Sequence, residues 1–402
     1  MTVSNDYDAM KPEIWSKRNQ ANLALKNIAR QQASTKEQAN LYNGQKVSRP
    51  TSPEVSFQNL TLGDGAYTRQ SLTSVKESLT VNKWDASVVT FSDDEIKQIR
   101  NDKATVNDTI DRGSYQLNRN LDRTYFAEYS NARNTSSLVT PTNTTIISDI
   151  QSVHKGLRQT GVEMNAPWFL NVDAEVTQLI QENLILRQTK LGDSNIRNSF
   201  GYMTKFGGFD VFEANESLTW TGRINIATNP SEGDTVIIDG VTFTFNATPS
   251  GAGSVDIGAT AAESVDNLIT LINAPSTTTA TGIALSTADA SKFQSAGHTL
   301  ISAVDNTTYI ALTSTNGRIT LGETFTDTTD NVSDMVLHCL GGRMGAIDLV
   351  IQKDIQTEVK PVDSSFKTDY ATQMLWGIKT FEEGAKRLID FQIRTQADTA
   401  SA

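Results

Sequence analysis

The sequence has one cysteine, Cys339, and no apolar run near the roughly 20 residues that span a bilayer. A single cysteine can form no internal disulfide and has no second cysteine for a thiolate metal site. The first residues have neither the basic nor the apolar stretch of a signal peptide. We therefore expect a chain that is made and kept in a cytosol and is stabilised by packing or by other copies of itself.

Positive charge is also scarce. The 402 residues contain 46 Asp and Glu against 35 Lys and Arg, which gives a net charge of −11. Proteins that bind nucleic acid through its phosphates normally carry a basic excess, because counterion release supplies much of the affinity. The charge therefore argues against tight DNA binding. The length is sufficient for two or three domains with a sizeable core.

Sequence patterns that would identify an enzyme are missing. There is no Gly-x-Ser-x-Gly, His-Glu-x-x-His or paired Cys-x-x-Cys pattern, and Gly341-Gly-Arg-Met-Gly345 lacks the spacing of a phosphate-binding loop. The one Cys-His neighbour pair, at 338–339, cannot act alone because adjacent side chains point apart. No histidine has a second ligand at metal-binding spacing; the three are His154, His298 and His338. We predict structural or exposed histidines, no catalytic residue, no metal and no cofactor.

Composition changes sharply between Thr219 and Asp334. These 116 residues hold twelve acidic and three basic side chains, a charge of −9, whereas the other 286 residues carry −2. The stretch also contains 24 threonines and none of the seven methionines. Such a shift predicts an inserted domain with a surface of its own.

Local patterns make this insert a β-rich α+β module. Residues 233–245 read as two strands around an Asp239-Gly240 turn, since Asp-Gly between β-branched runs is a strong hairpin signal. Residues 261–273 carry apolar side chains at helical spacing. Residues 308–314 and 318–321 are expected to form two further strands around an Asn316-Gly317 turn.

The rest of the chain alternates helices and strands. Helices are predicted over 12–33, from Ser92 to about Ile99, over 106–133, over 145–157 and after a cap at Asp173. Strands are predicted over 167–172, 206–215 and 373–381. Residues 335–352 have a mixed helix-and-strand pattern, and the residues after 381 are predicted to form a polar tail. Residues 44–91 are expected to form a long hairpin with two largely polar sides, which exposes edges that a partner would have to cover.

Taken in order, these parts resemble a known family. Eight segments are similar to segments of the major capsid proteins of tailed bacteriophages. In chain order they are the arm helix, the long hairpin, Ser92-Asp-Asp-Glu-Ile, the long helix, Pro167-Trp-Phe-Leu-Asn, Gly208-Phe-Asp-Val-Phe-Glu-Ala-Asn215, Arg343-Met-Gly-Ala-Ile-Asp-Leu349 and Leu375-Trp-Gly-Ile-Lys379. The closest likeness is to podovirus-type coat proteins with an inserted domain. The resemblance covers about residues 10–218 and 335–395.

The resemblance implies the Johnson fold, an α+β class shared with herpesvirus capsids. It implies an N-terminal arm (1–43), an extended E-loop hairpin (44–91), a peripheral domain with a long spine helix (92–160) and an axial domain. The axial domain would comprise 161–218 and part of 335–402. The rest of 335–402 would complete the peripheral domain and form a tail. The acidic insert (219–334) would decorate the capsid.

The function implied is self-assembly into pentamers and hexamers of an icosahedral shell that encloses double-stranded DNA without binding it specifically. Scaffolding and portal proteins are the implied partners, and a decoration protein is a further candidate. The implied place of assembly is the bacterial host cytoplasm, and the implied final location is the virion capsid. No membrane is involved. Two alternatives remain open: another virion structural protein of the tail or decoration type, and an acidic hydrolase with two converging carboxylates.

Under this interpretation, function resides in contacts between subunits. The hairpin charges are expected to pair with a neighbouring subunit, and two apolar residues of the arm are expected to anchor it. Each of these six could instead serve local packing or a solvated face. The predicted interface residues are Arg69, Lys76, Glu77, Lys83, Trp15 and Ile28.

Overall fold

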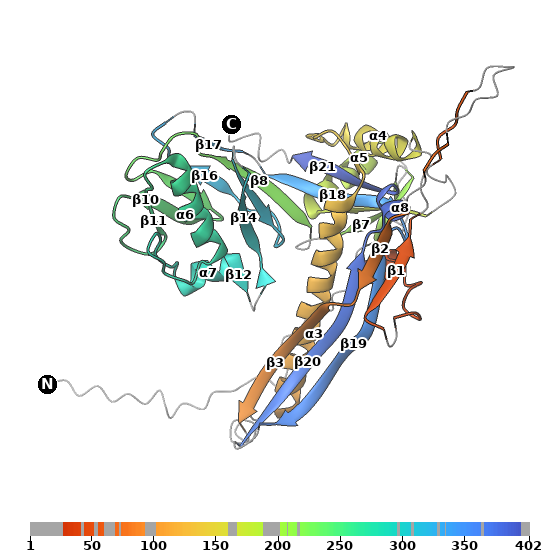
Figure 1. The fold of residues 1–402 in the computed structure, drawn as a ribbon, viewed down its shortest axis with the longest axis horizontal. Coiled ribbons are helices and arrows are strands. Elements are labelled where there is room, and N and C mark those ends of the chain that lie inside the picture. Colours follow the sequence, from red (N-terminus) through yellow and green to blue (C-terminus); the bar gives the residue numbers. More distant parts are fainter. Residues whose placement is uncertain are drawn as a thin grey trace. The chain divides into compact units, whose positions relative to one another are not determined.

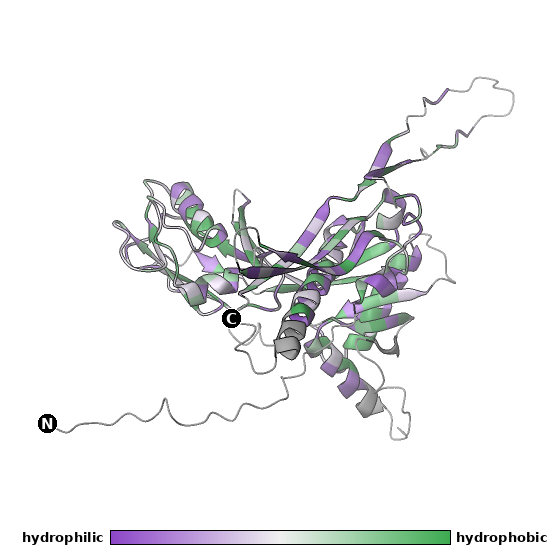
Figure 2. Ribbon diagram, turned by 90° about the horizontal axis from the view of Figure 1, so that it is seen from below, coloured by the Kyte–Doolittle hydropathy of each residue, from purple (hydrophilic) through white to green (hydrophobic). Residues whose placement is uncertain are grey.

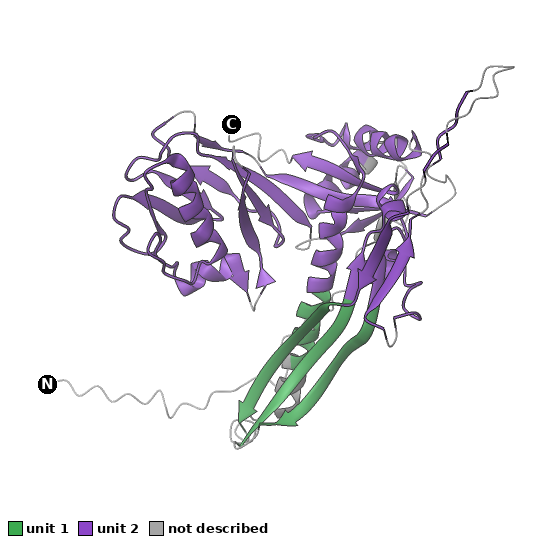
Figure 3. Cartoon of the chain, viewed as in Figure 1, with its two compact units in different colours: residues 1–25, 82–119, 351–376 green, residues 26–81, 120–350, 377–402 purple. Residues whose placement is uncertain are grey.

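The structure is a computed structural model that describes residues 27–41, 44–51, 55–59, 69–71, 74–92, 102–159, 167–187, 202–206, 208–214, 218–295, 298–306, 309–327, 330–333, 335–362 and 366–394. The chain divides into two compact units (Figure 3). Unit 1 comprises residues 1–25, 82–119 and 351–376, and unit 2 comprises 26–81, 120–350 and 377–402. Three elements continue across the division: α3 (Asp102–Ala127), β19 (Asp348–Pro361) and β20 (Lys367–Lys379).

Unit 1 contains a three-stranded sheet with the order β19-β20-β3, where β3 is Lys83–Ser92. The first part of α3 approaches this sheet at Gly113, where a Cβ atom would lie 3.2 Å from the Ser87 hydroxyl. Leu117 of α3 is buried. The helix predicted over 106–133 therefore exists, and its apolar stripe serves packing.

Unit 2 is built around a ten-stranded sheet with the path β14-β15-β8-β18-β5-β7-β6 (Figure 1). Every residue of β5 (Trp168–Val172) is buried, as expected for a strand covered on both faces. Hydrophobic residues concentrate in the strands of this sheet (Figure 2). The strands on this path are β14 (Ile301–Asp305), β15 (Ile310–Ser314), β8 (Thr219–Asn225), β18 (Val336–Arg343), β5, β7 (Phe209–Glu213) and β6 (Tyr202–Phe206).

The C-terminal part differs from the sequence prediction. The predicted polar tail contains β21 (Leu388–Arg394), which pairs along β18 and with the short β4 (Asn134–Thr135). The strand carries apolar residues at 388, 389, 391 and 393, and all four are buried. The mixed pattern predicted over 335–352 resolves into strands β18 and β19 without a helix.

Helices of unit 2 follow the expected patterns closely. The described helix α4 (Ile146–Gln159) buries Ile146, Ile150, Val153 and Leu157, the face predicted from the spacing. Helix α5 (Ala174–Arg187) is capped by Asp173, whose carboxylate accepts a 3.0 Å bond from the backbone N–H of Val176. The short helical segments are α1 (Ala29–Gln32), η2 (Glu128–Asn131) and α8 (Glu382–Ala385).

Residues 226–330 form the acidic part of unit 2. A four-stranded sheet with the order β11-β10-β9-β16 carries the predicted turn, where Asp239 and Gly240 have φ angles of 50° and 72°. Helix α6 is capped by Thr260 and buries the predicted apolar face in part. The elements here are β9 (Thr235–Ile238), β10 (Val241–Asn246), β11 (Ser254–Asp256), α6 (Ala261–Asn273), α7 (Thr287–Phe293), β12 (Gln294–Ser295), β13 (His298–Thr299), β16 (Leu321–Glu323) and β17 (Asn331–Val332).

The strands on either side of Asn316-Gly317 exist, but they do not pair with each other. Strand β15 lies between β14 and β8, whereas β16 pairs with β9 in the four-stranded sheet. Gly317, with a φ of 94°, allows the chain to turn from one sheet to the other.

Antiparallel pairing of β8 with β17 and β18 defines where residues 226–330 enter and leave the large sheet. Asn225 is the direct partner of Asn331, and Thr221 is the direct partner of Val336. The two registers differ by one residue, so a bulge lies between β17 and β18. The residues between Asn225 and Asn331 connect β8 to β17, and two of their strands, β14 and β15, return to the large sheet on the other side of β8.

Two of the remaining predictions fall mainly on residues that the structure does not describe. Of the helix predicted over 12–33, only residues from 27 onward are described, and α1 is the helical part. Residues 93–101, which hold most of the helix predicted after Ser92, are outside the described ranges. Among the helices that are described, none is both long enough and apolar enough to cross a membrane.

Candidate functional site

The hairpin predicted over 44–91 is formed by β1 (Lys46–Pro50) and β2 (Lys76–Thr80), which pair antiparallel. The pairing continues beyond these strands: the backbone N–H of Thr51 donates to the carbonyl of Val75 at 2.8 Å. Further out, the N–H of Ser56 donates to the side-chain carbonyl of Gln70 at 3.1 Å. Residues 83–92, predicted as the end of the hairpin, instead form β3 and pair with β20.

Apolar side chains are exposed on the outer part of this hairpin. Val55 is 65% exposed, Val75 is 62% exposed and Phe57 is fully exposed. Exposed apolar groups that gather on one segment mark contact surfaces more often than isolated ones do. The hairpin therefore offers a surface that its own chain leaves uncovered.

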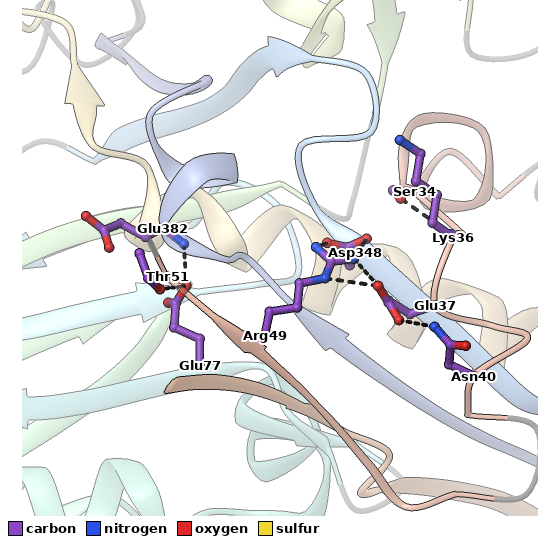
Figure 4. A network of polar contacts seen from close by, with 9 residues as sticks. All are labelled: Ser34, Lys36, Glu37, Asn40, Arg49, Thr51, Glu77, Asp348 and Glu382. Atoms are coloured by element: carbon purple, nitrogen blue, oxygen red, sulfur yellow. Dashed lines mark hydrogen bonds and ion pairs between the residues drawn. The ribbon is translucent and has the colours of Figure 1, made fainter. Parts of the chain in front are cut away.

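A polar network fixes the base of the hairpin (Figure 4). Arg49 of β1 donates from Nε to Glu37 at 2.9 Å and from Nη1 to Asp348 at 3.0 Å. Its guanidinium carbon also lies 4.5 Å from the centre of the Phe381 ring. Asp348 is buried, so the ion pair places Arg49 against a carboxylate that water does not reach freely.

The charges in this network reinforce one another. Hydrogen bonds from Asn40 and then from Arg49 lower the pKa of the Glu37 carboxyl below its usual value. Burial alone would lower the pKa of Arg49, but its bonds to Glu37 and the charge of Asp348 raise it. Glu37 and Arg49 thus stay ionised through the neutral pH range.

Glu77 of β2 ties the second strand to the same region. Its carboxylate accepts a 3.0 Å bond from the backbone N–H of Glu382 at the start of α8. It also accepts a 3.4 Å bond from the hydroxyl of Thr51 (Figure 4). Both strands of the hairpin are therefore anchored within unit 2.

The six predicted interface residues fall in different environments. Arg69, Lys76 and Lys83 are exposed, although Lys83 belongs to β3 and not to the hairpin. Glu77 has the local partners just described, and Ile28 is buried within its own chain, 7% exposed. Trp15 lies outside the described residues.

The sequence did not indicate the Arg49 network. Its carboxylates, Glu37 and Asp348, are separated from Arg49 by 12 and 299 positions along the chain. No local spacing connects residues so far apart. The start of β19 forms a β-bridge between Asp348 and Ser34, and this bridge brings Asp348 close to Glu37 and Arg49.

The buried His338 lies in a second polar cluster. Its Nδ1 is 2.9 Å from a carboxylate oxygen of Asp390, and its Nε2 is 2.7 Å from the hydroxyl of Thr221. The ring stacks on Tyr129 at 4.2 Å between centroids. Nowhere in the described ranges do three or more potential metal-ligating side chains form a group.

The chain matches no protein-family model and no curated protein. It is similar in structure to a chain of Mycobacterium phage Che8 with 11% identity and a TM-score of 0.49, covering 96% of this chain and 97% of that chain. It is also similar to the capsid of Helicobacter pylori bacteriophage KHP30, with 9% identity and a TM-score of 0.49, covering 98% of each chain. A third similar structure is the capsid of the cyanophage P-SCSP1u, with 11% identity and a TM-score of 0.48, covering 96% of this chain and 94% of that chain. Each of these likenesses extends over nearly the whole of both chains.

Proposed function

We propose that the chain is the major capsid protein of a tailed bacteriophage, which assembles into pentamers and hexamers of an icosahedral shell around double-stranded DNA. The observation that carries this proposal is the hairpin at 46–80. Its base is fixed by Arg49, while Val55 and Phe57 beyond it are exposed. A segment held rigidly at one end with uncovered apolar groups at the other is suited to lie on a neighbouring copy.

A second uncovered surface in unit 1 supports the same function. Trp84 and Val88 of β3 are 72% and 56% exposed, and they share one face of the strand because side chains alternate. Val359 of β19 and Phe366 before β20 are also exposed. A sheet with this much free apolar surface is typical of a subunit that is completed by assembly.

The parts of the fold take the roles that the resemblance implies. In this proposal α3 is the spine helix, the hairpin at 46–80 is the E-loop, and 219–334 is the inserted domain. Its charge of −9 suits a solvent-facing surface, while the nearly neutral remainder suits a wall around a polyanion. Scaffolding, portal and decoration proteins are the proposed partners, and assembly takes place in the host cytoplasm.

Assembly of the purified chain tests the proposal. We expect sedimentation velocity and negative-stain electron microscopy to detect shells or capsomer rings. The double substitution Val55→Ser and Phe57→Ser should abolish them, whereas Val304→Ser should not, because that equally exposed valine lies in the acidic part. Discrete monomers at high concentration, under crowding and with a co-expressed scaffolding candidate, would overturn the proposal.

Excision of the insert tests its role separately. Because Asn225 and Asn331 are direct partners, a two-residue Asn-Gly turn can replace residues 226–330 and keep the β8–β17 register. The deletion also removes β14 and β15, which leaves β8 at the edge of the large sheet. We expect the shortened chain to fold and to form closed shells, as an outward ornament requires. Open tubes or aggregates would instead assign the insert a role in curvature or folding.

A further inference from the structure

A cavity of about 420 Å³ opens on one face of the ten-stranded sheet of unit 2. Four neighbouring strands contribute to it: β15, β8, β18 and β21. In one row across these strands, Thr313 pairs with Thr221, Thr221 with Val336, and Val336 with Arg394. Because alternate residues of a strand share a face, the side chains two positions away line the same cavity.

The lining is positively charged. Arg223 and Arg394 line the cavity, and the described residues that line it include no aspartate or glutamate. The positive charge of the lining contrasts with the whole chain, whose net charge is −11. The guanidinium carbon of Arg223 lies 4.5 Å from the centre of the Tyr309 ring, and this cation–π contact restrains the side chain.

Polar groups beside the arginines are also held in place. His338 is fixed between Asp390 and the hydroxyl of Thr221. Asp390 is 4% exposed and also accepts a 2.9 Å bond from the side-chain amide of Gln392, so it orders the imidazole from behind without lining the cavity. The cavity surface thus presents restrained hydroxyl, imidazole and guanidinium groups.

We propose that this cavity binds a small organic molecule through a carboxylate or phosphate group. Two arginine side chains match the forked geometry of such oxyanions, and Thr313 adds a hydroxyl to the same face. A volume of 420 Å³ lies within the range of small-molecule sites and exceeds what an inorganic ion alone requires. This proposal does not rest on the proposed capsid function.

The alignment of Thr221, His338 and Asp390 resembles a catalytic triad but lacks its setting. In hydrolases the nucleophile lies on an exposed sharp turn beside backbone N–H groups that stabilise an oxyanion. Thr221 instead lies inside β8, paired with β15 on one side and β18 on the other. Binding is therefore the function that this geometry supports.

Calorimetric titration of the full chain tests the site. The probes are phenyl phosphate and benzoate for the two oxyanions, inorganic phosphate for the ion alone, and benzyl alcohol as the neutral analogue. We expect at least one organic anion to bind with a Kd below about 1 mM, more tightly than inorganic phosphate. Which of the two organic anions binds more tightly distinguishes a phosphate site from a carboxylate site. Added salt should weaken the binding of that anion.

Variants locate the binding. Arg223→Gln and Arg394→Gln should each weaken it more than about tenfold, and Arg223→Lys should retain part of it. Arg318→Gln is the matched control, because Arg318 pairs with Glu175 outside the cavity. Circular dichroism verifies that each variant is folded. Absence of organic-anion binding, equal binding of benzyl alcohol, or unchanged binding in both cavity variants would overturn the proposal.

Discussion

The carboxylate of Asp122 accepts a 2.9 Å hydrogen bond from the backbone N–H of Ala29. A second bond comes from the N–H of Ile28 at 3.3 Å. Asp122 is only 2% exposed, so the bonds fix the start of α1 to a charge that is almost removed from water. Burial raises the pKa of Asp122 to about 7, although these two N–H groups and the charge of Arg30 oppose the shift.

This raised pKa predicts a loss of stability as pH rises. Between the ordinary value of 3.8 and about 7, the folded state keeps a proton that the unfolded chain has released. The folded state therefore binds more protons, and raising the pH through this window favours unfolding. We expect Asp122 to contribute a decrease of about 2–3 kcal/mol in unfolding free energy from pH 5 to pH 8.

Urea denaturation at several pH values measures this contribution. Asp122→Asn should flatten the decrease relative to the wild-type chain. The matched control is Asp266→Asn on the exposed side of α6, which should keep the wild-type pH dependence. Identical slopes for the wild type and Asp122→Asn would show that Asp122 does not titrate in this window.

Arg49→Ala should destabilise unit 2 by about 1–3 kcal/mol, because it leaves the buried Asp348 carboxylate without its ionic partner. Arg49→Lys should recover only part of this loss, since an ammonium group cannot bond both carboxylates as a planar fork. Chemical denaturation checks both values. Equal stability of the alanine variant and the wild type would refute the anchoring role of Arg49.

Two glycines should respond to alanine in opposite directions. Gly240 has a φ of 72° in the turn between β9 and β10, so Gly240→Ala should cost about 1 kcal/mol although the space is open. Gly156 lies within α4, where an added Cβ atom would meet nothing within 4 Å, so Gly156→Ala should stabilise by about 0.5–1 kcal/mol. Thermal unfolding of the pair tests the signs.

Cys339 should report global unfolding. The thiol is fully buried in β18, and burial raises its pKa, with the charges of Asp173 and Asp390 adding to the effect. A thiol held in this state is a poor nucleophile. We expect alkylation by iodoacetamide only at the rate of unfolding, and rapid labelling of the native chain would contradict the burial.

Local signals in the sequence were sufficient for many elements of unit 2. The Asp239-Gly240 turn, the cap at Asp173 and the apolar strand at Trp168–Val172 all appear where they were predicted. Each depends on neighbouring residues alone. Pairing between distant strands has no such signal, which is why β3 was assigned to the hairpin although it pairs with β20.

The missed strand β21 shows a different difficulty. Its apolar residues alternate in part with Asp390, Gln392 and Arg394, so the segment reads as polar. Asp390 is tolerated in the sheet because His338, far away in the sequence, satisfies it. The candidate anion site was invisible for the same reason, since its arginines belong to β8 and β21 and meet only in the folded sheet.

Strand β21 also governs the order of events during synthesis. Ile389 pairs with Asn134, 255 residues earlier in the chain. At about 5–20 residues per second, the ribosome produces the later strand roughly 10–50 seconds after the earlier one. During that delay β18 lacks the partner that pairs along its whole length, so this edge of the large sheet stays open until translation reaches Arg394.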